Sequence, residues 1–352
     1  MSIQTSVTNL LGIKSPIVAA PMAGASGGAL AAQVTLAGGF GFLSAGYDSV
    51  DALKKELKVA RNHLQINEQQ TLPIGVGFLC WQLEKFPAKA EELLAAALES
   101  HPQAVWFSFG EDLGRWVNHI RKHDPNAGTK DAVKIFIQIS TVKDLLLAIN
   151  AWKVDAIVVQ GNEAGGHGLS SSLPLLTLFP ILFKVSAENN GPPLLAAGGL
   201  ANGAQIASLL TLGASGVVLG TRFLMCPESF YSDAQRHALV EAQSSQSIRT
   251  MAFDYARNTL GWPEGIDGRG LRNGAASLNA STVEDFERGE DLDTLRQKFT
   301  EGTRTGDTSR LLVWAGSSVG LTSKIMPAKE IVDELHEECI RSLQAAVKVL
   351  VQ

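Results

Sequence analysis

The chain has 352 residues, of which 45% are hydrophobic and 18% are charged. This length leaves room for two average domains or for one large barrel with an insertion, and the composition argues against long disordered regions. The formal net charge is -5 and there is no run of basic residues, which argues against nucleic-acid binding through bulk electrostatics.

Cysteine usage and uncharged stretches further limit the class of protein. Cys80, Cys226 and Cys339 are far apart and form no CxxC pair or metal-ligand spacing, which indicates free thiols in a reducing compartment, the cytoplasm, and no metal site. Residues 15–47 and 189–221 lack charge over more than the length of a membrane span. Proline and Gly-Gly steps interrupt both stretches, so we interpret them as buried strands, glycine loops and small-residue helices, and we expect no membrane association.

Eight short apolar runs are predicted to be strands. Most are continuously apolar rather than alternating, which is typical of parallel strands whose two faces are both covered. The predicted strands are residues 17–20, 41–44, 74–78, 104–108, 134–138, 156–160, 194–197 and 216–219. Apolar residues at helical spacing lie between them, and Ser49 and Thr141 are the expected N-caps of two such helices. An amphipathic helix is expected to close the chain after Pro327.

The alternation of strands and helices favours an α/β fold, a (β/α)8 TIM barrel, over a doubly wound sheet. A weak internal repeat supports the barrel, because PIVAA at 16–20 and PLLAA at 193–197 each precede a small-residue helix. The pattern breaks after the eighth strand, where residues 227–320 are predicted to form a mostly helical insertion. The barrel would then comprise residues 1–226 and 321–352. The insertion would cover the carboxyl ends of the strands, either as a lid or pocket wall or as a stabilising cap.

Glycine-rich turns follow the seventh and eighth predicted strands. Gly198 and Gly199 follow the seventh strand, and Gly220 and Thr221 follow the eighth. In many barrels these two loops bind a phosphate through backbone N–H groups, and glycine lets the backbone approach the ligand closely. Tight chain reversal alone is the alternative, but two adjacent glycine turns favour phosphate binding.

The sixth predicted strand ends in Gln160 and leads into a glycine-rich loop that carries His167. Glycines of this loop, including Gly165 and Gly166, are expected to fold the histidine back over the strand ends. Histidine exchanges protons near neutral pH, so His167 is the candidate general acid or base. The nearby Glu163 is expected to be solvated rather than paired with His167.

The first predicted strand runs into Ala20, Pro21 and Met22. Proline fixes a rigid turn at this point, and the methionine thioether offers a soft apolar surface suited to a flat ring. Taken alone, a methionine at a strand end is more typical of a core position.

These motifs together resemble the nitronate monooxygenase family, formerly called 2-nitropropane dioxygenases. The matching segments are APMAG at 20–24, AGGFGFLSAG at 37–46, VQGNEAGGHG at 159–168, AAGGLANG at 196–203, LGTRF at 219–223 and VWAGSSVG at 313–320. The resemblance spans nearly the whole chain, and the loop that contains His167 is its most specific part.

The resemblance implies an FMN-dependent barrel that oxidises alkyl nitronates, and nitroalkanes as well if a base removes their α-proton, with O2 to a carbonyl compound and nitrite. The active-site histidine of the family matches His167. The implied cofactor contacts are Ala20, Pro21, Met22, Gly77, Gln160, Gly165, Gly166, Gly198, Gly199, Gly220 and Thr221. Two departures indicate a divergent branch: Gly77 stands where many members carry Asn, and residues 26–28 stand where many carry a Thr-Pro step.

Three other functions are consistent with the same motifs. They are an NADH-dependent flavin reductase of the quinone or enoyl type, a flavin-free isomerase or lyase acting on a phosphorylated substrate, and a non-catalytic phosphate-binding protein. In the insertion, Arg257, Arg269 and Arg272 are candidates to meet a substrate carboxylate, with ion pairs or exposed charges as the alternative. The expected partners are a small nitronate or nitroalkane and O2, and the small-residue surfaces permit a homodimer without requiring one.

Overall fold

The computed structural model describes residues 1–272 and 281–349, and it confirms the predicted barrel. Parallel strands close in the order β1-β2-β3-β4-β5-β6-β8-β9, and β9 pairs with β1. The barrel strands are β1 (Ile17–Ala19), β2 (Phe40–Ser44), β3 (Leu72–Leu79), β4 (Pro102–Ser108), β5 (Lys134–Ile139), β6 (Ala156–Gln160), β8 (Leu194–Ala197) and β9 (Gly216–Leu219). Each of them coincides with one of the apolar runs predicted to be strands.

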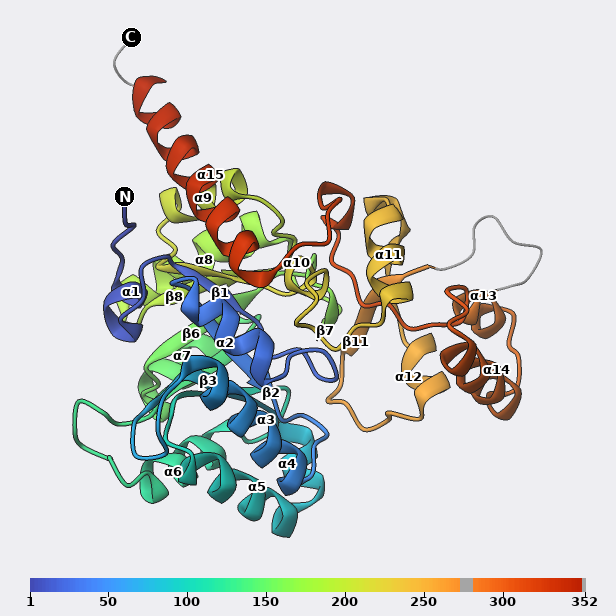
Figure 1. Cartoon of the computed structure of the whole chain (residues 1–352), viewed down its shortest axis with the longest axis horizontal. Helices are drawn as coiled ribbons and strands as arrows, with labels where there is room; N and C mark the ends of the chain where they lie inside the picture. Colours follow the sequence, from blue (N-terminus) through green and yellow to red (C-terminus); the bar gives the residue numbers. More distant parts are fainter. Residues whose placement is uncertain (273–280, 350–352) are drawn as a thin grey trace.

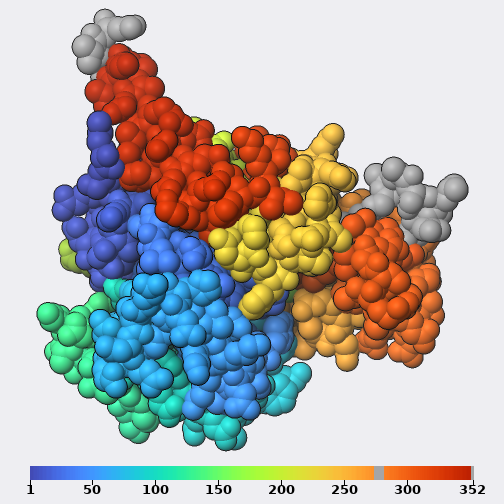
Figure 2. Space-filling view, in the orientation of Figure 1, coloured from blue at the N-terminus to red at the C-terminus, as the bar shows by residue number. Residues whose placement is uncertain are grey.

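Helices surround this barrel, as Figure 1 shows. Those of the barrel part are α1 (Ser6–Leu11), α2 (Gly28–Leu36), α3 (Val50–Leu64), α4 (Cys80–Lys85), α5 (Pro87–Glu99), α6 (Leu113–His123), α7 (Val142–Leu147), α8 (Leu175–Glu188), α9 (Gly203–Thr211), α10 (Thr221–Leu224) and α15 (Ala328–Val349). Helix α15 packs against α9 and α2, and its C-terminal end projects away from the barrel (Figure 1), as the space-filling view in Figure 2 also shows. Across 1–272 and 281–349, no helix combines the length and the apolar character needed to cross a bilayer.

The predicted helix starts are confirmed by their capping contacts. The hydroxyl of Ser49 accepts a hydrogen bond from the N–H of Ala52 at 3.2 Å, at the start of α3. The hydroxyl of Thr141 accepts one from the N–H of Asp144 at 3.1 Å, at the start of α7. Each cap satisfies an N–H group that has no partner within the first turn of its helix.

Aromatic side chains fill the interior of the barrel. The ring of Phe42 lies 5.2 Å from those of Phe40 and Trp106, and 5.3 Å from that of Phe136. Gly75 on β3 leaves room for this group, because a Cβ there would lie 2.0 Å from the ring of Phe42. The interior is therefore a packed core rather than a pore, and a ligand site has to lie beyond these rings at the strand ends.

The segment after β9 is mostly helical, as predicted, but it also contains two strands that were not predicted. Its elements are α11 (Asp233–Glu241), β10 (Ser247–Thr250), α12 (Ala252–Arg257), β11 (Ile266–Leu271), α13 (Thr282–Glu287) and α14 (Leu292–Thr305). Strand β11 pairs antiparallel with β10 and with β7 (Gly166–Leu169), which lies in the glycine loop after β6. The sequence IDGRGL shows no apolar alternation, so β11 is stabilised by its two neighbours rather than by β propensity.

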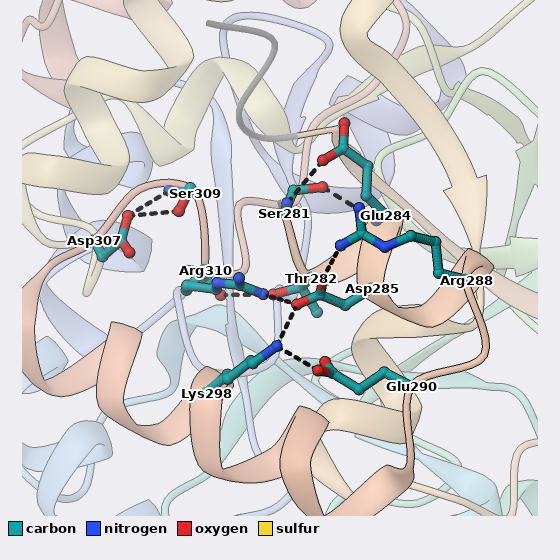
Figure 3. A network of polar contacts seen from close by, with 10 residues as sticks. All are labelled: Ser281, Thr282, Glu284, Asp285, Arg288, Glu290, Lys298, Asp307, Ser309 and Arg310. Carbon is teal, nitrogen blue, oxygen red and sulfur yellow. Dashed lines mark hydrogen bonds and ion pairs between the residues drawn. The ribbon is translucent and has the colours of Figure 1, made fainter. Parts of the chain in front are cut away.

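A buried carboxylate ties the outer helices of this segment together (Figure 3). Asp285 on α13 receives ion pairs from Arg288, from Lys298 on α14 at 3.2 Å, and from Arg310 on the returning chain. The Asp285 side chain is 3% exposed and that of Arg310 is 11% exposed. Removing the Asp285 carboxylate would take an ion-pair partner from the nearly buried Arg310, which is costly, whereas Lys298 would keep Glu290 as a partner.

We therefore expect Asp285→Asn to lower the free energy of unfolding by about 3 kcal/mol. Burial alone would raise the pKa of the Asp285 carboxyl, but hydrogen bonds from its cationic partners hold that pKa below its ordinary value. The stabilisation is thus complete above the pKa of an unfolded aspartate, about 4, and is lost as the pH falls from there through the lower folded-state pKa. Denaturant unfolding at pH 7 and at acid pH measures both effects. Asp293→Asn is the control, because the Asp293 side chain is 86% exposed; equal losses in both variants would contradict the prediction.

Candidate active site

A cavity of about 1140 Å³, counted with its open mouth, lies at the carboxyl ends of the barrel strands. Its walls come from the turns after β1, β2, β8 and β9, from the glycine loop after β6, and from the segment that follows β9. The cavity therefore lies where barrel enzymes carry their active sites.

The structure brings nearly all of the predicted site residues together in this cavity. His167 and the predicted cofactor residues other than Gly77 line it: Ala20, Pro21, Met22, Gln160, Gly165, Gly166, Gly198, Gly199, Gly220 and Thr221. Gly77 instead lies behind Pro21, since a Cβ on Gly77 would be 2.2 Å from the Cβ of Pro21. The absence of a side chain at residue 77 lets β3 pack against the turn after β1, and Gly77 is the one predicted cofactor residue that does not line the cavity.

At one end of the cavity, the glycine turns lie close to the backbone of other segments of the chain. Gly198 and Gly199 adopt φ values of +114° and +68°, a region that favours glycine. The hydroxyl of Thr221 accepts a hydrogen bond from the N–H of Gly316 at 2.9 Å. A Cβ on Gly165 would lie 2.5 Å from the same nitrogen. Three distant parts of the chain thus meet around this end of the cavity.

Gln160 connects the end of β6 to the histidine loop. Its side-chain amide nitrogen donates to the backbone carbonyl of His167 at 3.2 Å. Its own backbone carbonyl accepts a hydrogen bond from the hydroxyl of Ser140 at 2.8 Å. The polar residue at the end of an apolar strand therefore holds the loop back over the barrel, which was the arrangement expected from the glycines.

His167 lies on β7 and is enclosed by aromatic rings. Its imidazole stacks on Trp262 with ring centroids 3.7 Å apart and meets Trp314 edge-on at 4.9 Å. Gly268 faces His167 across the β7–β11 ladder, and a Cβ there would lie 2.5 Å from Trp314. The side chain of His167 is 8% exposed. The ring is therefore fixed in place at the cavity wall.

Asp254 on α12 is the functional residue that the sequence reasoning missed. Its carboxylate lies 3.0 Å and 2.9 Å from Nε2 of His167 through its two oxygens, and the residue is fully buried. Thr259 and Trp262 also donate to it, at 2.8 Å and 3.2 Å. No motif marks Asp254, because its only signal is a contact with a residue 87 positions earlier in the chain.

Glu163 does not pair with His167, in agreement with the prediction, but it is not simply solvated. Its carboxylate accepts the backbone N–H of Leu175 at 2.9 Å and 2.8 Å, at the first residue of α8. A carboxylate at a helix start satisfies an unpaired N–H group and interacts favourably with the helix dipole. Glu163 therefore anchors the glycine loop to α8.

The three candidate arginines have different surroundings. Arg257 on α12 lines the cavity, and within the described residues its guanidinium makes no hydrogen bond or ion pair. Arg269 instead donates to backbone carbonyls of Asn162 and Ser247, each at 3.0 Å. Arg272 pairs with a surface carboxylate at 2.8 Å. Only Arg257 is positioned to meet a ligand in the cavity.

Tyr47 adds a neutral hydrogen-bond donor to the same wall. Burial raises the pKa of its phenol to about 12, an effect that Arg257 partly opposes and Asp254 reinforces. The phenol therefore keeps its proton throughout the physiological range. Together with Arg257 it makes this part of the cavity suitable for an anion.

Comparisons with known proteins agree on one family. The family model for nitronate monooxygenases matches residues 4–338 of the chain. The chain belongs to the nitronate monooxygenase family. A nitronate monooxygenase of Neurospora crassa is 32% identical, over 94% of this chain and 92% of its own. One of Metarhizium robertsii is also 32% identical, over 95% of this chain and 94% of its own.

Solved structures with the same architecture extend this result. FabK from Thermotoga maritima superposes with a TM-score of 0.76 at 25% identity and covers 99% of both chains. A nitroalkane oxidase from Streptomyces ansochromogenes superposes with a TM-score of 0.75 at 25% identity, over 97% of this chain and 100% of its own. The family resemblance predicted from the motifs is confirmed, and the protein is an enzyme.

Proposed function

We propose that this enzyme uses FMN and O2 to oxidise alkyl nitronates to carbonyl compounds and nitrite. The observation that carries the proposal is that His167 lies in the same cavity as the glycine turns predicted to bind phosphate. Membership of the nitronate monooxygenase family supports oxidation of nitronates. Nitroalkanes become substrates as well if His167 removes their α-proton.

The cavity residues fit both the phosphate and the ring of FMN. Within the described chain, the half-buried N–H groups of Gly198, Gly199 and Gly220 donate no hydrogen bond to a protein group, so they are free to meet phosphate oxygens. Near the barrel core, the buried Nε1 of Trp106 also has no acceptor. An unsatisfied buried donor is unfavourable, and a heteroatom of a bound ring would satisfy it.

The phosphate would be held by the turns at residues 198–199 and 220–221, and the ring by residues 20–22, Gln160 and Gly165. When bound, FMN supplies the redox chemistry that carries electrons from the nitronate to O2. The fixed turn at Pro21 and the hydrogen bond from Gln160 to the histidine loop keep the ring-binding residues and His167 in one arrangement.

Arg257 gives the site a preference for anions. A nitronate carries a full negative charge, whereas a nitroalkane is neutral, and an unpaired guanidinium in a largely apolar cavity attracts the charged form. Tyr47 provides a second donor on the same side. We therefore assign recognition of the nitronate charge to Arg257.

Replacing Arg257 with methionine is expected to raise KM for a nitronate about 10-fold, since a hydrogen bond to a charged group contributes about 1.5–3 kcal/mol. KM for the matching neutral nitroalkane should change little. Steady-state kinetics with both substrates measure the difference. Arg272→Met is the control, because Arg272 makes a surface ion pair away from the cavity. An equal rise of KM for both substrates in Arg257→Met would argue against charge recognition.

The proposal is tested by the visible spectrum of the purified protein after addition of FMN, followed by an aerobic assay with a preformed nitronate. Flavin bands, O2 uptake and release of nitrite are the expected results. Failure to bind a flavin would remove the redox function and favour the isomerase or the phosphate-binding alternative. Anaerobic bleaching of the flavin by NADH, with none by nitronate, would favour the reductase.

A cytoplasmic location is a further part of this proposal, and the small-residue surfaces permit a homodimer without requiring one. The cysteines support a reducing compartment, because Cys80, Cys226 and Cys339 are all free and buried. Cell fractionation and the mass of the protein in solution test these two expectations.

A further inference from the structure

The environment of Asp254 determines which nitrogen of His167 carries a hydrogen. The Asp254 carboxylate is fully buried, and it meets the hydroxyl of Thr259, the indole N–H of Trp262 and Nε2 of His167. An ionised carboxylate only accepts hydrogen bonds, and an indole nitrogen only donates them. All of these contacts are satisfied together when Nε2 carries a hydrogen and donates it to the carboxylate.

The second ring nitrogen, Nδ1, is then the acceptor of the neutral imidazole. Within the described residues no protein group makes a hydrogen bond to Nδ1, and the ring lines the cavity. The contact of Nε2 with the carboxylate, stacking on Trp262 and the edge-on contact with Trp314 together hold the ring in this orientation. The lone pair of Nδ1 is therefore the basic group that remains for a ligand.

We infer that Asp254 is a positioning residue that fixes His167 as the Nε2–H tautomer, so that Nδ1 is the base that accepts the α-proton of a nitroalkane. This inference rests on the proposed function and adds to it separate roles for Asp254, which positions the ring, and for His167, which accepts the proton. In the step, the α C–H bond breaks, its electron pair stays on the substrate as the nitronate anion, and the proton forms a bond to Nδ1. The resulting imidazolium keeps its Nε2–H bond to the Asp254 carboxylate, which offsets the new positive charge.

The inference predicts that loss of the Asp254 carboxylate slows turnover of a neutral nitroalkane much more than turnover of the nitronate of the same compound. An asparagine at residue 254 can turn its NH2 group toward Nε2, which would then accept a hydrogen bond and move the imidazole hydrogen to Nδ1. For Asp254→Asn we expect kcat for a neutral nitroalkane such as nitroethane to fall about 100-fold or more. The preformed nitronate needs no proton removal, so its kcat should change little from that of the wild type. Asp254→Glu, which retains a carboxylate, should recover part of the nitroalkane rate.

Two further measurements separate positioning from a general loss of structure. Asp124→Asn removes a buried carboxylate that accepts backbone N–H groups of Asn126 and Val133, away from the cavity, and should leave both rates unchanged. Nitrogen-15 NMR of histidine-labelled wild-type holoenzyme reads the tautomer directly, whether or not any variant folds. We expect an Nε2–H signature for His167.

Several results would overturn the inference while leaving the proposed function intact. These are an Nδ1–H signature in the wild type, an Asp254→Asn variant with an unchanged nitroalkane rate, and equal losses on nitroalkane and nitronate with flavin retained. A wild-type enzyme that oxidises the nitronate but never the nitroalkane would overturn it as well. If instead the wild type oxidises no nitronate, the proposed function itself fails.

Discussion

Replacing His167 with asparagine is expected to lower kcat/KM for a neutral nitroalkane by at least about 100-fold, within the range that general-base catalysis contributes. The reason is that no other imidazole lines the cavity in the described chain. Oxidation of a preformed nitronate should continue, because the anion has already lost its proton. Initial rates on both forms of one compound, with freshly dissolved nitroalkane, measure the effect.

His63→Asn is the matched control for this variant, since His63 is an exposed residue of α3 that does not line the cavity. It should retain the wild-type rate on both substrates. The flavin spectrum of the His167 variant confirms that the cavity is intact. An unchanged nitroalkane rate in His167→Asn would remove the base assignment, and a loss on both substrates would indicate a role in binding instead.

The second large effect is expected on FMN binding, from a substitution in the turn at residues 198–199. Gly199 has a φ of +68°, and a Cβ there would lie 2.8 Å from the Cβ of Glu163. Gly199→Ala therefore combines a left-handed backbone strain of roughly 1–2 kcal/mol with displacement of a neighbouring loop. We expect Kd for FMN to rise at least about 10-fold, since 1.4 kcal/mol is a factor of 10 in affinity. Titration of the apoprotein with FMN, followed by flavin fluorescence, measures this change.

Gly289→Ala separates backbone strain from the contact with the cofactor. Gly289 has a similar φ of +77°, and nothing lies within 4 Å of a Cβ there. It does not line the cavity, so its substitution should lower stability without changing Kd for FMN. If both variants bound FMN equally well, the assignment of the turn at Gly199 to the phosphate would be wrong.

The barrel and its cofactor turns could be predicted because their signals are local in the sequence. Parallel strands that are covered on both faces form short continuous apolar runs, such as AIVVQ in β6 and GVVL in β9. The glycines that end these strands stand directly after them. The helix caps are also local, because Ser49 and Thr141 contact residues only three positions away.

The remaining parts depend on contacts between distant segments, which one sequence does not reveal. Strand β11 is polar and rich in glycine, and its pairing with β7 only becomes apparent in the folded chain. Asp254 lies in an ordinary helical segment, AFDYAR, whose pattern carries no sign of its partner. The family resemblance implied a cofactor contact at Gly77, but the packing of Gly77 against Pro21, away from the cavity lining, becomes apparent only in the folded chain.

The pairing of β7 with β11 makes the surroundings of the histidine depend on two separate stretches of the sequence. Residues 166–169 and 247–271 are far apart in the gene, yet they share one antiparallel sheet. A chimera between two relatives that exchanged only the later segment would replace Asp254 and Trp262 beside the histidine by the residues of the other relative. Because residues 198–199 and 220–221 lie between the two segments in the sequence, one continuous exchange that keeps the histidine with its own carboxylate also carries those glycine turns with it. The two glycine turns and the surroundings of the histidine are therefore inherited together in such an exchange.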